Sequence, residues 1–329
     1  MNKMEKILDE LRFISTHPKQ QLEQYLAAGK KVVGCLPYYC PEELVAAAGM
    51  VPFGLWGAEI QVSEAKRYFP SFICSILQTT LELGIKGEFD RLTAVMIPIL
   101  CDSLKGMEAN WRYGVKKVPV INVAHAQNRK MQAGLEFTVS QYRKIKKQLE
   151  KLAETPITDR AIAVAIKTYN EQRGVMRRFL AAAGKHPELI SFADRNAVVK
   201  SSYFMDAASH TAKVRELADL LEQAPESKHQ GPKVVISGIT ADYSGLIKIF
   251  DDCQIAVVDD QLTQGSLRFR FDVPLTADPI VGLAEQIGQI EGCPVLFDPG
   301  KQRGQMLIDL VKQSEAQGVI FVKTKFCDP

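Results

Sequence analysis

The chain has 329 residues, of which 46% are hydrophobic and 24% are charged, and its formal net charge is +3. This length suggests about two domains. The composition excludes a disordered, collagen-like or small disulfide-stapled chain, and the small net charge gives no reason to expect a nucleic-acid partner. Residues 1–14 place apolar residues at helical spacing between Lys and Glu, and no apolar run is long enough to span a bilayer. We therefore expect a cytoplasmic protein without a secretory signal or a membrane partner.

After this first helix, apolar β-branched segments alternate with amphipathic helical segments. Strands are predicted at residues 32–36, 51–57, 92–100 and 118–124, and helices at residues 40–50, 63–86 and 103–111. In the helix at 40–50, Pro41 suits the first turn and Gly49 suits the end. This alternation is typical of a parallel, doubly wound sheet.

The remainder of the chain divides into a helical stretch and a second alternating unit. Residues 135–226 have helical periodicity with little strand signal, and a polar linker follows at residues 227–231. Strands are then predicted at residues 232–239, 254–260 and 318–326, with helices at residues 244–252, 277–290 and 303–313.

We therefore predict an N-terminal α/β domain (1–134), a helical connecting region (135–231) and a C-terminal α/β domain (232–329). The expected fold class is α/β, with two flavodoxin-like or Rossmann-like parallel-sheet domains and a cleft between them. The chain stops three residues after its last predicted strand, whereas such a sheet normally continues with a covering helix. We expect the C-terminal domain to be truncated, or its edge to be covered by a partner.

The cysteine pattern favours thiols over disulfides. Seven cysteines are an odd number, no two form a CxxC pair, and the cytoplasm keeps thiols reduced. A cysteine in an apolar helix or strand is more often a small buried hydrophobic residue than a ligand. We apply that interpretation to Cys35, Cys253 and Cys293.

Three other cysteines lie where an open α/β sheet binds ligands, which is at the carboxyl ends of its strands. Cys101 ends the strand at 92–100, and Cys327 follows the strand at 318–326. Cys74 lies early in a predicted helix, where the helix dipole lowers the pKa of a thiol. Three thiolates from three such elements fit a [4Fe–4S] cluster that leaves one iron without a cysteine ligand.

Several strings resemble a known family. They are PEELVAAAGMVPFGLWGA, YFPSFICSILQ, PILCDSLKG, RNAVVK, KVVISGI, IAVVDDQLTQGSLRFRFDV, RGQMLIDL and KFCDP. Together they are similar to the 2-hydroxyacyl-CoA dehydratase and benzoyl-CoA reductase family of iron–sulfur proteins, and most similar to its shorter β-type dehydratase subunits. The strings follow the family order over nearly the whole chain.

The resemblance implies a lyase that eliminates water from a (R)-2-hydroxyacyl-CoA to give an enoyl-CoA through a ketyl radical. It implies a [4Fe–4S] cluster held by Cys74, Cys101 and Cys327, an α-type partner subunit, and an ATP-dependent iron–sulfur activator that injects one electron. In this family the substrate-binding cluster is attributed to the α-type subunit and the β-type cluster is regarded as an electron relay. The alternatives are a benzoyl-CoA-reductase-type subunit, a non-catalytic iron–sulfur relay or scaffold, and a small-molecule binding protein with inert cysteines.

Other polar residues have a structural and a functional interpretation. Glu42 and Glu43 are acid/base candidates, although first-turn glutamates also complement a helix dipole. Candidates for holding CoA phosphates are Arg268, Arg270 and Arg303. The alternative interpretation is that these arginines are ordinary solvated surface residues. The further candidates are Cys40 as an extra ligand or a free buried thiol, His125 as a proton carrier or a structural residue, and Trp56 as a core or interface residue.

Overall fold

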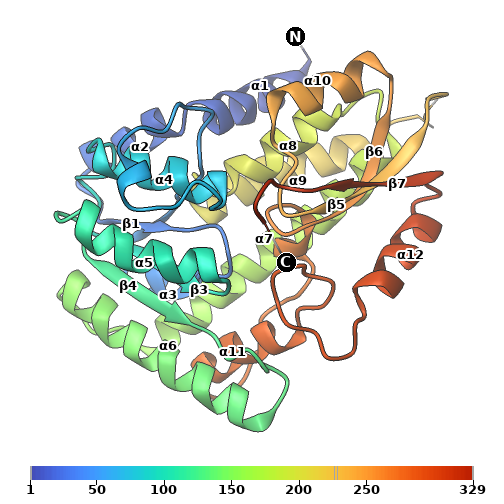
Figure 1. The fold of residues 1–329 in the computed structure, drawn as a ribbon. Coiled ribbons are helices and arrows are strands. Elements are labelled where there is room, and N and C mark those ends of the chain that lie inside the picture. The colour runs from blue at the N-terminus through green and yellow to red at the C-terminus, as the bar shows by residue number, and fades with distance from the viewer. Residues whose placement is uncertain (1, 226, 228, 328–329) are drawn as a thin grey trace.

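The computed structural model describes residues 2–225, 227 and 229–327. Lys228 of the predicted linker and the last two residues of the string KFCDP lie outside the described residues. The described chain folds into two parallel sheets surrounded by helices, which confirms the predicted α/β class (Figure 1). Within the described residues, no helix is both long and apolar enough to cross a membrane.

The first sheet has the strand order β2-β1-β3-β4, with every pair parallel. Its strands are β1 (Val32–Cys35), β2 (Val51–Gly54), β3 (Ala94–Ile99) and β4 (Val120–Ala124). All four residues of β1 are buried, as is usual for a central parallel strand that is covered on both faces. The helices of this part are α1 (Lys3–Thr16), α2 (Pro18–Ala27), α3 (Glu42–Ala47), α4 (Ser75–Ile85) and α5 (Asp102–Gly114), with a short 3₁₀ turn η1 (Ala65–Arg67).

Four helices follow, as the periodicity of residues 135–226 predicts. They are α6 (Gln132–Ala153), α7 (Asp159–Lys185), α8 (Phe192–Ser201) and α9 (Ala207–Glu222). The Thr158 side chain caps α7 by accepting a hydrogen bond from the Ala161 N–H, and Ser191 and Asp194 form a capping box on α8. The long helix α7 packs on α9, on α3 and on β6 of the second sheet, so it connects the two sheet units.

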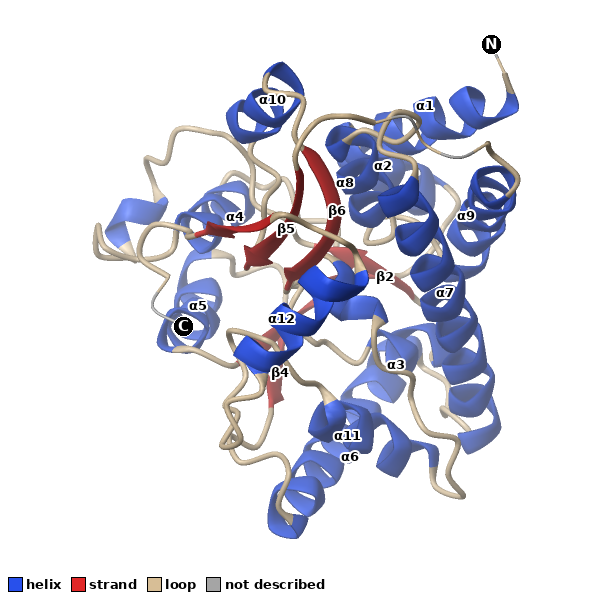
Figure 2. Ribbon diagram, turned by 90° about the vertical axis from the view of Figure 1, so that its right-hand side faces the viewer, coloured by secondary structure: helices blue, strands red, loops and turns tan. Residues whose placement is uncertain are grey.

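The second sheet has the order β6-β5-β7 and is also parallel. Its strands are β5 (Lys233–Gly238), β6 (Ala256–Leu262) and β7 (Gly318–Val322). The remaining elements are α10 (Ser244–Asp252), a 3₁₀ turn η2 (Ser266–Phe269), α11 (Pro279–Gln289) and α12 (Arg303–Gln313). Helix α12 packs on β5 and β6, whereas α11 packs against α6 and α7 (Figure 2). Residues late in the chain therefore share a hydrophobic core with β1, α3 and α6.

Three sequence predictions differ from the structure. The helix predicted at 63–86 begins only at Ser75, because Pro70 has no backbone N–H and restricts the residue before it. The strand predicted at 318–326 ends at Val322, and a loop of four residues carries the chain to Cys327. Cys253 is exposed at the end of α10, so the prediction that it is a buried hydrophobic residue is wrong.

Candidate functional site

Two of the predicted ligand cysteines are the N-cap residues of helices. Cys74 is the N-cap of α4, and Cys101 lies two residues after β3 and is the N-cap of α5. Cys74 is buried, with 9% of its surface exposed, and Cys101 is half-buried. Each cysteine thus takes the place that Ser, Thr or Asp usually takes at a helix start, beside N–H groups that have no partner within the helix.

The electrostatics of these two thiols combine burial with helix N–H groups. Burial raises the pKa of Cys74, and the N–H groups of Leu77 and Ile76 oppose that rise. Burial likewise raises the pKa of Cys101, and the Leu104 N–H opposes it. The thiols are therefore protonated at neutral pH without a metal, while donors for a thiolate are already in place. Metal binding would release these protons.

The third cysteine comes from the other end of the chain. Cys74 belongs to one hydrophobic core cluster, and Cys101 and Cys327 both pack against that cluster. After β7 the chain runs on to Cys327, which packs against the cluster that contains Leu104 and Met107 of α5. Burial raises the pKa of Tyr38 well above its usual range, and Cys74, Cys327 and Cys101 raise it further.

Among the described residues, the three thiols do not form a site for a single metal ion. Within the described ranges, no group of three or more His, Cys, Asp or Glu side chains could hold one metal ion. A four-iron cube places each cysteine on a different iron, so its thiolates need not converge on one point. Three buried or half-buried thiols in or against one hydrophobic cluster are the donor type that such an iron–sulfur cluster uses.

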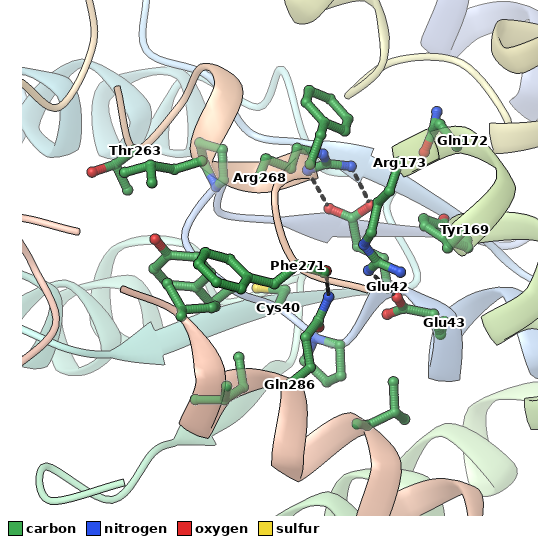
Figure 3. A pocket seen from close by; sticks show the side chains of 18 of the residues that line it. Cys40, Glu42, Glu43, Tyr169, Gln172, Arg173, Thr263, Arg268, Phe271 and Gln286 are labelled. Carbon is green, nitrogen blue, oxygen red and sulfur yellow. Dashed lines mark hydrogen bonds and ion pairs between the residues drawn. The ribbon is translucent and has the colours of Figure 1, made fainter. Parts of the chain in front are cut away.

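A pocket with about 730 Å³ of empty space, part of it open to solvent, is lined by Cys40 but by none of these three cysteines (Figure 3). Its walls come from the loop after β1, from α3, α6 and α7, from η2 with the residues that follow it, and from α11. Six aromatic side chains contribute to the walls: Tyr39, Tyr142, Tyr169, Tyr203, Phe269 and Phe271. All three predicted segments of the chain contribute to it.

Two ion pairs lie in this pocket. Arg268 donates to both carboxylate oxygens of Glu42, with Nη1–Oε1 at 2.9 Å and Nη2–Oε2 at 2.7 Å, and its guanidinium carbon lies 4.0 Å from the centre of the Tyr203 ring. Arg173 of α7 donates to Glu43, which is 3% exposed (Figure 3). Burial opposes the charge of Arg268, but Glu42 outweighs it, so the pKa of Arg268 is raised. Both predicted carboxylates are thus held by guanidinium groups.

The other two predicted arginines lie in the second sheet unit. Arg270 folds back onto β6, where it donates to the Asp259 carboxylate at 3.1 Å and to the Asp260 carbonyl oxygen at 2.7 Å. Arg303 begins α12 and donates to the Ser237 hydroxyl at 3.2 Å. Among the described residues, no carboxylate forms an ion pair with Arg303. The structure therefore separates the three arginines instead of gathering them into one patch.

The structure also adds residues that the sequence did not single out. Arg173 lines the pocket. The pKa of Tyr38 is raised by all three predicted ligand cysteines, and Tyr38 follows β1 at the carboxyl end of the sheet, which is a signal that could have found it. His125 is half-buried and contacts the Tyr39 carbonyl oxygen, as a structural histidine does. The Cys40 thiol lies 3.2 Å from the Leu36 carbonyl oxygen and lines the pocket.

Comparison with known proteins identifies the family. A family model described as 2-hydroxyglutaryl-CoA dehydratase, D-component, matches residues 37–329, and the chain belongs to this family. It is 44% identical over 330 residues to the (R)-phenyllactyl-CoA dehydratase beta subunit of Clostridium sporogenes, covering 100% of this chain and 88% of that subunit. It is 40% identical over 329 residues to the beta subunit of (R)-2-hydroxyglutaryl-CoA dehydratase from Acidaminococcus fermentans, covering 98% of this chain and 87% of that subunit.

A more distant relative is a benzoyl-CoA reductase subunit of Thauera aromatica. It is 26% identical over 308 residues, which cover 91% of this chain and 79% of that relative. The family predicted from the sequence strings is thereby confirmed.

Proposed function

We propose that this chain is the β-type subunit of a cytoplasmic (R)-2-hydroxyacyl-CoA dehydratase, which eliminates water from its substrate to give an enoyl-CoA. The observation that carries the proposal is identity of 44% and 40%, over nearly the whole chain, to beta subunits of two such dehydratases. A beta subunit implies a partner, and we propose an α-type subunit in that role. The benzoyl-CoA reductase subunit is less similar, at 26%, which favours dehydration over ring reduction.

We further propose that Cys74, Cys101 and Cys327 hold a [4Fe–4S] cluster. The packing of all three cysteines in or against one hydrophobic cluster supports this assignment, and so do the N–H groups at the starts of α4 and α5, which stabilise negative charge on sulfur. When bound, such a cluster stores a single electron and passes it on. An ATP-dependent iron–sulfur activator is the proposed source of that electron. The ketyl-radical route belongs to the same proposal, because the β-proton of a 2-hydroxyacyl-CoA is not acidic without one-electron reduction of the thioester.

The remaining site residues take supporting roles in this proposal. Glu42 and Glu43 line the pocket, each paired with an arginine, and they are the acid/base groups in this proposal. Arg303 is the arginine we favour for a CoA phosphate, because its charge is not matched by a carboxylate among the described residues. We also propose flavodoxin-like units at 1–134 and 232–329 with the site in a cleft between them; the strand order β2-β1-β3-β4 supports this for the first unit.

The test is anaerobic reconstitution with iron and sulfide, followed by metal analysis and visible spectroscopy. We expect about four irons per chain in the wild type, and loss of that iron in Cys101→Ala and in Cys327→Ala. Cys253→Ala is the matched control, because Cys253 is exposed at the end of α10, and it should keep its iron. Full iron content in both ligand variants, or no iron in the wild type, would contradict the cluster assignment.

A further inference from the structure

The charged side chains that line the pocket neutralise one another. Arg268 donates to both carboxylate oxygens of Glu42, and Arg173 donates to Glu43 (Figure 3). The other terminal nitrogen of Arg173 donates to the Asn170 amide oxygen at 2.8 Å. Both ion pairs are largely buried, since no more than 17% of any of the four side chains is exposed. Each arginine is thus matched by one carboxylate, and the charges of the pocket lining sum to zero.

The uncharged polar side chains of the walls also have partners within the protein. Gln172 Nε2 lies 3.2 Å from Nδ1 of His210, and Gln286 Nε2 donates to the Phe271 carbonyl oxygen at 2.6 Å. Thr263 is the third such residue, and its hydroxyl lies 3.7 Å from a cysteine sulfur. A ligand in this pocket therefore meets polar groups that are already paired, together with the remaining lining residues, which are Pro37, Tyr39, Cys40, Pro41, Tyr142, Tyr169, Tyr203, Leu267, Phe269, Phe271, Leu283, Ile287 and Ile290.

This charge balance decides which kind of chemical group can enter the pocket. A carboxylate that leaves water needs a counter-charge and hydrogen-bond donors in return. In this pocket it would find both guanidinium groups already bound to glutamates, and it would lie near the negative charges of Glu42 and Glu43. An uncharged alkyl or aryl group has no such cost, and it gains free energy by leaving water for the aliphatic and aromatic walls.

We propose that this pocket receives the acyl side chain of the substrate and selects chains that carry no charge, either aryl or branched alkyl. The ligand is the acyl group of a 2-hydroxyacyl-CoA, so the assignment rests on the proposed function and narrows its substrate class to acyl groups without a second carboxylate. The selectivity comes from the pairing of charges, because Arg268 would bind a carboxylate if Glu42 did not already occupy it. Glu42 is therefore the specificity-determining residue.

The experiment compares two CoA thioesters that differ only at the end of the acyl chain. Glutaryl-CoA ends in a carboxylate, whereas 5-methylhexanoyl-CoA ends in an isopropyl group of nearly the same shape. Each is titrated into the full chain by isothermal titration calorimetry, before and after anaerobic reconstitution. We expect 5-methylhexanoyl-CoA to bind at least about tenfold more tightly than glutaryl-CoA. Equal affinities for the two thioesters, or no binding of either, would overturn the inference.

Two variants test the role of the paired charges. Glu42→Gln leaves Arg268 without its carboxylate, and Gln286→Lys adds a cation to the half-buried wall of the pocket while both ion pairs remain. We expect each variant to bind glutaryl-CoA at least about tenfold more tightly than the wild type does. If Glu42→Gln does not fold, Gln286→Lys decides alone. A wild-type preference in the folded variants would overturn the inference.

The controls and the iron measurement separate this inference from the proposed function. Gln286→Met changes the same wall without adding a charge, and Glu222→Gln breaks an exposed ion pair, so both should keep the wild-type preference. A chain that takes up about four irons but does not distinguish the two thioesters would overturn the acyl pocket and leave the cluster assignment intact. A chain that takes up no iron but prefers 5-methylhexanoyl-CoA would contradict the cluster and support the pocket.

Discussion

The cysteines differ in the two properties that decide thiol reactivity, exposure and pKa. Cys253 is exposed, whereas Cys74 is buried and Cys101 half-buried, and burial raises the pKa of both of these thiols. The same residue type therefore serves three roles in one chain: a surface thiol, an apolar core residue such as Cys35, and a helix N-cap. Only the last of these roles places a thiol where N–H groups already favour the thiolate.

We predict that iodoacetamide modifies the metal-free chain at Cys253 at least about ten times faster than at Cys74 near neutral pH, because the reactive species is the exposed thiolate. Since a raised pKa means a smaller thiolate fraction at neutral pH, the rates at Cys74 and Cys101 should rise as the pH is increased. Peptide mass spectrometry over a time course measures all three sites at once. Equal rates at Cys74 and Cys253 near neutral pH would contradict this prediction, because they would mean that the start of α4 exposes Cys74 to the reagent.

At the scale of elements, a buried histidine joins three helices. His210 of α9 lies with Nε2 3.0 Å from the Val198 carbonyl oxygen of α8, and the Gln172 amide of α7 faces its Nδ1 at 3.2 Å. Burial lowers the pKa of His210 to about 4. The neutral ring, with a proton on Nε2 and a lone pair on Nδ1, satisfies both contacts, whereas a second proton would break the contact with the Gln172 amide.

This arrangement predicts a pH-dependent stability. The unfolded chain protonates His210 near its ordinary pKa and the folded chain only near 4, so between these values the unfolded state binds more protons and stability falls as pH falls. We expect the loss of unfolding free energy between about pH 7.5 and about pH 5 to be smaller by about 2 kcal/mol in His210→Phe than in the wild type. Urea denaturation at the two pH values measures it. Parallel losses in both proteins would mean that His210 titrates normally.

Local signals predicted the elements well where hydrophobic pattern and caps agreed. The buried VVGC run of β1 and the apolar run of β3 both form central strands. Gly49, with a φ of +71°, follows the end of α3 and stops the helix as predicted. The helix predicted at 63–86 was too long, because the apolar spacing continues through a segment in which Pro70 disfavours a helix. The partners of Glu42 and Glu43 could not be predicted, because Arg268 and Arg173 come from distant elements and only tertiary packing brings them together.

At the scale of the whole molecule, the Glu42–Arg268 pair joins parts of the chain that are far apart in sequence. Glu42 begins α3 beside the first sheet, Arg268 lies in η2 after β6, and Tyr203 after α8 stacks on the guanidinium. Arg177 of α7 adds a second connection by donating to both Asp272 oxygens at 2.9 Å. The pocket thus lies where three parts of the chain are tied together by charge.

We predict that Glu42→Gln and Arg268→Met each destabilise the protein by about 3 kcal/mol, because each leaves one largely buried charge without its partner. The double variant should lose less than the sum of the two, because it removes both charges at once. Urea denaturation of the four proteins gives the coupling energy. The control is Glu222→Gln, which breaks an exposed ion pair with Arg178 and should change stability little. Additive losses in the double variant would mean that Glu42 and Arg268 stabilise their own elements separately, and the pocket would then be held together chiefly by the apolar contacts that α11 makes with α6 and α7.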